Sequence, residues 1–272
     1  MPDQSLDQAA IMGGLYGDGI IALRGAFSPE WADRMAEDVW RCFEEAKAVP
    51  GGALPRGPNR FYVEVQPEKI RGFVDVATHP WFVAVCEAVL ARDYRIVEVG
   101  FDIPFPGAMD QPWHRDFASP EATLRGRRLN SLAFNLTAVD TRPEHGPFEI
   151  APGTQWDDIG EARDGMFPDR ALWPRYIERA APKMPQRGDI SVRSALTIHR
   201  GTANRSSEPR PVLVVGVDAP DATNAQHHDL QVTAPYLAQL PSRVRDHLDC
   251  RVVDRLEQVV QHHVIEGLVD SY

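Results

Sequence analysis

The chain has 272 residues, of which 43% are hydrophobic and 25% charged, and its 29 Lys and Arg against 39 Asp and Glu give a formal net charge of −10. This composition is that of an ordinary globular protein and excludes a disordered or fibrous chain, and the length suits one large domain. The acidic balance argues against nucleic acid as the partner, because phosphate binding needs a basic surface.

The first predicted element is a helix that begins at Ser28-Pro29. Serine is a favoured N-cap and proline is favoured in the first turn, and apolar residues then recur at every fourth position up to Phe43. The segment Val49–Gly52, with one proline and two glycines, ends this helix. A second, shorter helix is predicted from Pro80 to about Ala91, where apolar side chains again share one face.

From Arg60 onward the pattern changes to short runs rich in β-branched and aromatic residues, separated by Gly, Pro and Asn or Asp. We predict strands at residues 61–65, 96–105, 132–139, 148–150, 189–192, 196–199 and 212–217. Strands punctuated in this way are typical of an antiparallel sandwich or barrel and not of alternating βαβ units.

The C-terminal segment from Pro241 to Leu268 returns to a four-residue spacing of apolar residues. The members of this stripe are Val244, Leu248, Val252, Leu256, Val260 and Val264. The spacing predicts a helical tail that packs on the sheet, with a dimer interface as the alternative.

The residues with metal-binding chemistry centre on His114-Arg115-Asp116. In an extended segment, residues i and i+2 point to the same side, so His114 and Asp116 can reach one ion. A His-x-Asp pair alone is more often a surface pair or a simple His–carboxylate hydrogen bond. We predict His199 as the third ligand, because it ends the apolar run 195–198, where a buried polar side chain needs a partner. Two imidazoles and one carboxylate form the facial triad of non-haem Fe(II) oxygenases.

Arg210 follows His199 by eleven residues and opens the predicted strand 212–217. A connection of this length that returns antiparallel places Arg210 on the strand beside His199, roughly 4.8 Å away. A guanidinium there can bind a carboxylate with two hydrogen bonds, which is what the distal carboxylate of 2-oxoglutarate requires. The alternative is a surface arginine in a loop rich in Ser, Glu and Pro.

These segments resemble the phytanoyl-CoA dioxygenase family. Gln111–Asp116 (QPWHRD) is similar to its Q-x-x-H-x-D motif, and Glu144–Pro147 (EHGP) followed by Ala151–Thr154 (APGT) is similar to its N-G-P-L and P-G-[ST]-H turns. His199–Arg210 matches its H-x-G-x-x-N-x-S-x-x-x-R pattern. The motifs occur in the family's order over residues 94–218, and their combination is specific.

The resemblance implies a mainly β fold with flanking helices, a cupin-like double-stranded β-helix (jelly roll). It implies a single dioxygenase domain over residues 1–272, with a helical N-terminal part (1–93), a jelly-roll core (94–218) and a helical C-terminal tail (219–272). The implied cofactors are Fe(II), 2-oxoglutarate and O₂.

By position, the resemblance makes His114, Asp116 and His199 the iron ligands and catalytic residues, and Arg210 the residue that binds 2-oxoglutarate. Gln111 and Asn135 are further candidates to face the cosubstrate or the substrate. Thr202, Asn204 and Ser206 are expected to shape the loop before Arg210. Aromatic residues near the motifs are candidate walls of the substrate pocket, with plain core positions as the alternative: Phe105, Trp113, Phe117 and Trp156.

The expected reaction couples the oxidative decarboxylation of 2-oxoglutarate to hydroxylation of an unactivated C–H bond in a small molecule, such as a secondary metabolite. Epimerisation or oxidative cyclisation with the same cofactors is an alternative. A non-catalytic jelly-roll binding protein with a structural metal is the alternative of another class. The carboxylate of Asp116 disfavours halogenation, because the halogenases that resemble this fold have Gly or Ala there.

Other features of the chain indicate no macromolecular partner. No apolar run approaches the roughly 20 residues of a membrane helix, and residues 1–4 lack the start of a signal peptide. We therefore expect a cytoplasmic enzyme of a small-molecule substrate, with no membrane contact, as a monomer or a homodimer. His145, His227 and His228 lie in polar contexts and are expected to face solvent.

Overall fold

Two antiparallel β-sheets form the framework of the molecule, as the computed structural model shows for residues 6–118, 121–160, 165–222, 224, 227–261 and 265–269. Within these residues the larger sheet has seven strands, in the order β1 (Ile20–Leu23), β8 (Ile190–Ser194), β5 (Ser131–Thr137), β10 (Val212–Asp218), β4 (Arg95–Pro104), β3 (Arg60–Glu64) and β2 (Leu54–Pro55). The smaller sheet consists of β7 (Ala181–Pro182), β6 (Phe148–Ile150) and β9 (His199–Gly201). This is the arrangement of a double-stranded β-helix with flanking helices, the predicted fold class.

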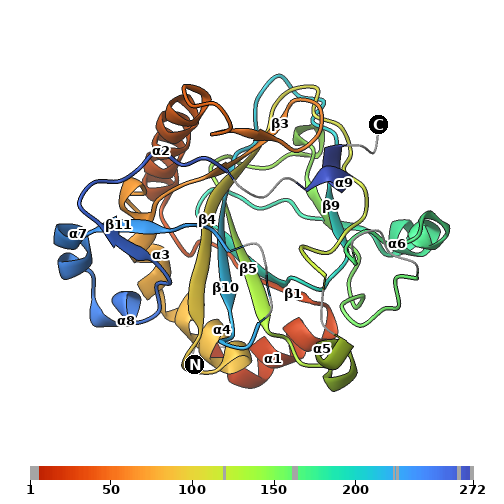
Figure 1. The fold of residues 1–272 in the computed structure, drawn as a ribbon. Coiled ribbons are helices and arrows are strands. Elements are labelled where there is room, and N and C mark those ends of the chain that lie inside the picture. Colours follow the sequence, from red (N-terminus) through yellow and green to blue (C-terminus); the bar gives the residue numbers. More distant parts are fainter. Residues whose placement is uncertain are drawn as a thin grey trace.

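Strand β10 lies at the centre of the larger sheet, paired with β4 on one side and β5 on the other (Figure 1). Because successive side chains of a strand point to opposite faces, Leu213, Val215 and Val217 are fully buried toward the helices. Val214 and Gly216 belong to the opposite face, which borders an internal cavity. The sheet therefore has an apolar face that packs on helices and a second face that is free to carry polar groups.

Helices cover the first of these faces (Figure 1). The helices in its core are α1 (Gln8–Gly17), α2 (Pro29–Lys47), α3 (Phe73–Thr78) and α4 (Pro80–Leu90). Both predicted helices are confirmed: the Ser28 hydroxyl accepts a hydrogen bond from the Trp31 amide (3.2 Å) at the start of α2, and α4 begins at Pro80. Helices α1 and α3 were not predicted.

The other elements are short and lie around the two sheets. They are α5 (Glu121–Gly126), α6 (Trp173–Arg179), α7 (Ala234–Gln239), α8 (Ser242–Arg245), α9 (Glu266–Val269), the 3₁₀ turns Pro67–Lys69, Pro143–His145 and Arg170–Leu172, and the parallel pair β11 (Gln231–Thr233) and β12 (Arg251–Val253). None of the described helices is long and apolar enough to span a bilayer.

The predicted helical tail is wrong. In place of one helix, the segment contains α8, the strand β12 and an irregular stretch up to residue 261. Val244 and Leu248 are buried, but Val252 and Val260 are 53% and 43% exposed, so the stripe does not form one packed face. Val264 lies outside the described residues.

The strand predicted at 196–199 is also wrong in its position. Residues 195–198 form a turn, and His199 begins strand β9 and does not end a strand. The turn is fixed by Arg115, whose Nε donates a hydrogen bond to the Leu196 carbonyl (2.8 Å). The Asp116 amide donates to the Ala195 carbonyl (3.1 Å), so the turn lies directly against the segment that carries His114 and Asp116.

Candidate metal centre

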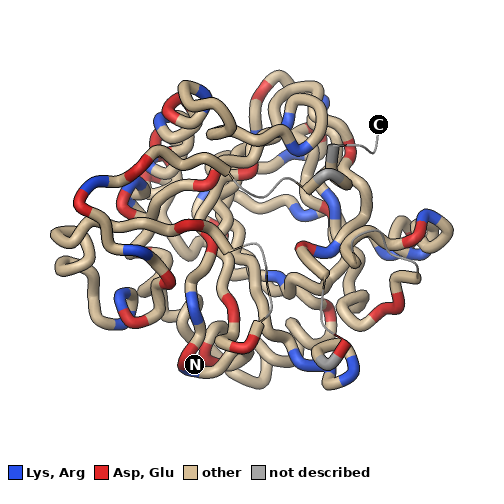
Figure 2. Tube along the Cα trace, in the orientation of Figure 1, with Lys and Arg blue, Asp and Glu red and all other residues tan. Residues whose placement is uncertain are grey.

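A cavity of about 1350 Å³, its open mouth included, is lined by residues of both sheets. Acidic and basic residues are interspersed along the chain trace, also near the middle of the molecule (Figure 2). Charged side chains of both signs line the cavity: Arg56, Arg60, Lys183, Arg193 and Arg210, with Glu98, Asp102, Asp116 and Asp218. Because charges are rarely buried without a partner or a function, this lining marks the cavity as the candidate functional site.

The backbone brings His114 and His199 together as a pair in an antiparallel bridge. Each amide donates to the carbonyl of the other residue (3.0 Å both ways), and the ring centroids are 4.4 Å apart. Each ring is fixed at Nδ1, which contacts the carbonyl of Pro112 (2.8 Å) or Thr197 (2.9 Å). A ring that donates Nδ1–H to a carbonyl presents its Nε2 lone pair, which is the form in which histidine binds a metal.

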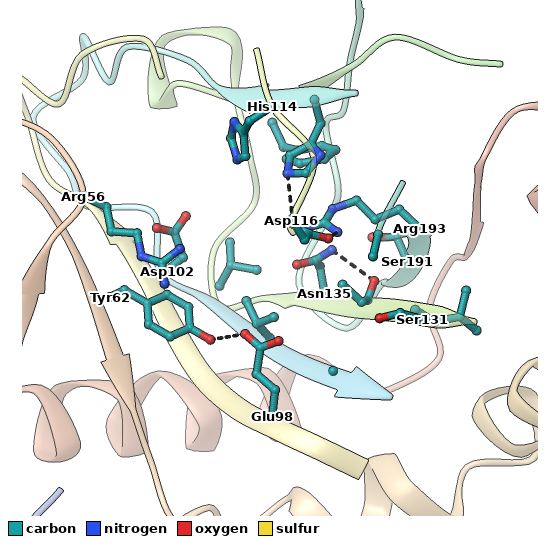
Figure 3. A pocket seen from close by; sticks show the side chains of 18 of the residues that line it. Arg56, Tyr62, Glu98, Asp102, His114, Asp116, Ser131, Asn135, Ser191 and Arg193 are labelled. Carbon is teal, nitrogen blue, oxygen red and sulfur yellow. Dashed lines mark hydrogen bonds and ion pairs between the residues drawn. The ribbon is translucent and has the colours of Figure 1, made fainter. Parts of the chain in front are cut away.

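Asp116 lies beside this pair (Figure 3). Its Oδ1 is 3.3 Å from His199 Nε2 and also accepts a hydrogen bond from Arg193 Nη2 (2.9 Å), while Oδ2 accepts from Arg193 Nη1. As the side chains stand, no group of three His, Cys, Asp or Glu residues in the described part of the chain has the arrangement of a metal-bound cluster. The three predicted ligands are neighbours, and the carboxylate is engaged by Arg193.

The electrostatics of these residues favour metal binding. Burial lowers the pKa of both histidines; for His114 the neighbouring His199 lowers it further, and for His199 Arg193 does so. Burial alone would raise the pKa of Asp116, but Arg193 and His199 lower it below its usual value. Neutral imidazoles and an ionised carboxylate are the protonation states that ligate a divalent cation, so the donor set fits Fe(II).

Arg210 reaches the cavity, although not by the predicted route. Strand β9 pairs with β6 in the smaller sheet, and Arg210 precedes β10 in the larger one, so the two are not adjacent strands. The Arg210 Nε donates to the carbonyls of His145 (3.3 Å) and Gly146 (3.1 Å). Burial and the nearby Arg60 lower its pKa to about 10, so it remains a cation at neutral pH.

A second guanidinium lies next to Arg210. Arg60 donates through Nε to Asp102 Oδ1 (2.9 Å), and its buried Nη1 has no hydrogen-bond partner among the described residues. Nη1 lies where a Cβ on Gly201 would be, so the glycine of the His-x-Gly motif leaves the room for this arginine. Two guanidiniums beside one aspartate leave a net charge of about +1 at this place, which fits the carboxylate of a dicarboxylic acid.

The loop before Arg210 is held by the side chains predicted for it. Asn204 Nδ2 donates to the carbonyls of Pro104 (3.1 Å) and Glu208 (2.8 Å), and Asn204 Oδ1 accepts from the Ser206 amide (3.0 Å). Thr202 Oγ1 donates to the Pro147 carbonyl (2.7 Å). These bonds fix the chain between β9 and β10 and so place Arg210.

Gln111 and Asn135 both line the cavity. The side-chain oxygen Oε1 of Gln111 accepts from the Gly201 amide (3.0 Å), so this residue also ties its segment to β9. Asn135 projects from β5 into the space beside Asp116 (Figure 3).

Only one of the four candidate pocket aromatics, Phe117, is among the described cavity-lining residues. Trp113 is next to His114 in the chain, and it is fully buried in a separate cluster with Tyr176. Phe105 packs on α2 against Phe43 (ring centroids 5.3 Å apart), and Trp156 packs near Tyr16 (6.1 Å). The prediction of these three as pocket walls is wrong, because their side chains face the cores outside the cavity.

The histidines expected to face solvent behave differently from one another. His145 is 1% exposed, in the turn that supplies carbonyls to Arg210. The side chain of His228 is buried at the cavity wall, and that of His227 is 40% exposed with its Nε2 2.9 Å from Asp218. The prediction that these side chains face solvent is therefore wrong for His145 and His228.

Known proteins share the sequence pattern and the fold. The model of the phytanoyl-CoA dioxygenase (PhyH) family matches residues 15–212. The epimerase SnoN in complex with Fe³⁺, alpha ketoglutarate and nogalamycin RO is 17% identical, with a TM-score of 0.61, over 78% of this chain and 83% of that chain. AviO1 from Streptomyces viridochromogenes Tue57 is 18% identical, with a TM-score of 0.60, over 81% of this chain and 98% of that chain. At these identities the two structures show a shared fold.

Proposed function

The chain belongs to the phytanoyl-CoA dioxygenase family, whose enzymes use Fe(II), 2-oxoglutarate and O₂, and on this premise we propose that it hydroxylates an unactivated C–H bond of a small molecule. The observation that carries the proposal is the convergence of His114, Asp116 and His199 on one cavity that Arg210 also lines.

In the proposed mechanism His114, Asp116 and His199 hold the iron. Iron held there would supply, with 2-oxoglutarate and O₂, the oxidising power for C–H cleavage, and the cosubstrate would leave as succinate and CO₂. The Nδ1 contacts of both histidines fix their ring planes, and Arg193 fixes the plane of the carboxylate. These contacts would limit the rotation of the three side chains when an ion binds.

Arg210 and Arg60 seat the distal carboxylate of 2-oxoglutarate. Both guanidiniums are buried, and Asp102 neutralises only one positive charge. A buried cation that is already oriented by carbonyls loses little side-chain freedom on binding an anion, so the seat is preorganised.

The substrate enters the part of the cavity that the metal centre and the 2-oxoglutarate seat leave free. Phe117 and Phe148 line it near the histidines, and Val212 and Val214 line it from β10. An apolar lining around the reacting carbon excludes water and favours attack on a C–H bond over side reactions.

The test is anaerobic purification, addition of Fe(II) and 2-oxoglutarate, and measurement of the visible absorption band and of succinate formation after O₂ is admitted. His199→Ala is expected to remove both signals, and Arg210→Ala to weaken both. His79→Asn is the matched control, because His79 caps α4 outside the cavity and asparagine is a good N-cap.

The product separates hydroxylation from its alternatives. A hydroxylated product gains one oxygen atom, whereas an epimer keeps the mass of the substrate and a cyclised product loses two hydrogen atoms. Iron binding without succinate formation across a broad substrate panel would contradict the enzyme and favour a non-catalytic binding protein.

A further inference from the structure

Tyr62 on β3 and Glu98 on β4 meet on the cavity wall, on the side away from His114 (Figure 3). The Tyr62 hydroxyl donates to Glu98 Oε1, and His228 Nε2 lies 3.8 Å from the same oxygen. The Arg56 guanidinium stacks on the Tyr62 ring, 4.2 Å from its centroid. The cluster is outside the metal centre and the cosubstrate seat, and no step proposed above uses it.

The second oxygen of Glu98 is available to a ligand. Oε2 accepts no hydrogen bond from the described residues, and it lies over Gly216, where a Cβ would be 2.6 Å from it. The Glu98 side chain is 25% exposed, and this exposure is to the cavity. A carboxylate oxygen in such a position favours a hydrogen-bond donor, because a polar group that is removed from bulk water and left unpaired destabilises the protein.

The cavity wall between Glu98 and the candidate metal centre is built from small residues. Strand register places Arg193, Ala133, Gly216 and Glu98 in one row across four strands. Three strand spacings separate the ends of this row, about 14 Å. Ala133 carries only a methyl group, and the Glu98 carboxylate itself lies over Gly216, so a ring-sized molecule can lie over Ala133 with one edge at this carboxylate and the other beside Asp116.

The charges of the cavity nearly cancel, so the lining offers a charged ligand little net attraction. The described lining contains five Lys and Arg side chains against four Asp and Glu. Fe(II) and the 2-oxoglutarate dianion add opposite charges of equal size. The Arg56 guanidinium already lies beside the Tyr62–Glu98 pair, so an ammonium group would add a cation where one is present.

We propose that Glu98, oriented by Tyr62, accepts a hydrogen bond from a hydroxyl group of an uncharged, hydroxylated substrate and thereby places a distant C–H bond at the metal centre. The assignment rests on the proposed function and names the substrate class of the same site. Arg56 supplies a donor next to Glu98, so a pair of neighbouring hydroxyls matches the anchor better than one.

The test uses three probes on one ring: trans-1,2-cyclohexanediol, cyclohexylamine and cyclohexanecarboxylate. Each is titrated calorimetrically into the enzyme loaded with Fe(II) and 2-oxoglutarate without O₂. The diol is expected to bind with a millimolar Kd, as suits a ligand of this size, and at least about tenfold more tightly than either charged probe. Glu98→Gln is expected to weaken diol binding about tenfold, which is about 1.4 kcal/mol. Tyr62→Phe is expected to weaken diol binding by less than this.

The control is Glu44→Gln, an exposed carboxylate on α2, which is expected to leave diol binding unchanged. Retention of the 2-oxoglutarate absorption band in Glu98→Gln shows that this variant is folded. Tighter binding of the amine, or equal binding of the diol to wild type and Glu98→Gln, would overturn the proposal, as would no diol binding by a wild type that shows the band. Absence of the band in wild type would refute the proposed function instead.

Discussion

The two faces of the seven-stranded sheet are built from alternate residues of the same strands, yet they differ in almost every physical property. On β5, Phe134 is fully buried and its ring packs against Phe82 of α4 in a tilted arrangement, with ring centroids 4.2 Å apart. The next residue, Asn135, faces the cavity. On β10, Val215 packs toward the helices while Gly216 leaves space for Glu98.

The difference shows where the free energy of folding comes from. Apolar burial on the helix-covered face stabilises the sheet, whereas buried charges on the cavity face cost desolvation energy that their ion pairs offset only in part. The helix-covered face can be built for packing alone, and the cavity face can then hold arginines and carboxylates in positions set by function.

The largest effect on this contrast is expected from Phe134→Ala. Removing a buried aromatic side chain leaves a cavity in the helix-covered face and should lower the free energy of unfolding by about 3–5 kcal/mol. Asn135→Ala, one residue on and on the other face, should lower it by less than about 1 kcal/mol. Urea unfolding followed by circular dichroism measures both, and equal losses would show that the two faces do not divide their roles in this way.

A second effect, of opposite sign, is expected from Glu64→Gln on β3. Burial and the neighbouring Glu98 raise the pKa of Glu64 to about 7 in the folded chain, against 4.5 without these effects. Between these values the folded state keeps a proton that the unfolded state releases, so stability falls as the pH rises through this window. Glutamine removes this loss, and the variant should be more stable than wild type by up to about 3 kcal/mol at pH 8.

Near pH 4 the same variant should match wild type, because Glu64 is then protonated in both states. Thermal or urea unfolding at the two pH values measures the difference, with Glu44→Gln, the same exchange at an exposed position, as the control. A gain in stability that stays constant with pH would mean that the ionisation of Glu64 does not oppose folding.

The sequence predicted the helix-covered face well and the tail badly, for one reason. Caps such as Ser28 and strands with clear alternation carry local signals that tertiary contacts reinforce. The four-residue stripe from Val244 to Val264 does not distinguish a helix from a strand, because a spacing of four is a multiple of the strand period as well as close to the helix period. Val252 accordingly lies in β12.

On the cavity face, motif spacing found the three proposed iron ligands but not the residues that hold them in place. His114, Asp116 and His199 stand in a recognisable pattern. Arg193 and Glu98 lie inside strands and belong to no motif, and their partners Asp116 and Tyr62 lie 77 and 36 residues away. Only strand register brings such pairs together, and no local pattern in the sequence encodes that register.

Arg210→Ala is expected to raise the Kd of 2-oxoglutarate about 100-fold, which is about 2.8 kcal/mol. Arg210→Lys keeps the charge but not the two-pronged geometry and should recover only part of the loss. The anaerobic absorption band measures both values. Because the Arg210 side chain is buried beside Arg60, whose positive charge opposes its own, Arg210→Ala should leave thermal stability nearly unchanged. A large loss of stability would place Arg210 among the packing residues.

The smallest effect is expected from Arg193→Ala. This substitution changes a residue of the cavity face that contacts a proposed metal ligand but is not one itself. Arg193 touches neither histidine through a hydrogen bond, but it holds both oxygens of Asp116. Without it the carboxylate can rotate, and the affinity for Fe(II) should fall at least about tenfold, as for other partners that orient a metal ligand. Competition with a chelator measures this affinity without turnover.

The control is Arg128→Ala, which removes an exposed arginine that pairs with Asp221 outside the cavity and should leave Fe(II) affinity unchanged. The opposite outcome for Arg193→Ala, tighter Fe(II) binding, is equally informative. It would mean that the guanidinium competes with the metal for Asp116 more than it orients the carboxylate. Since the two roles predict changes of opposite sign, the one titration decides whether the cavity face prepares the metal site or restrains it.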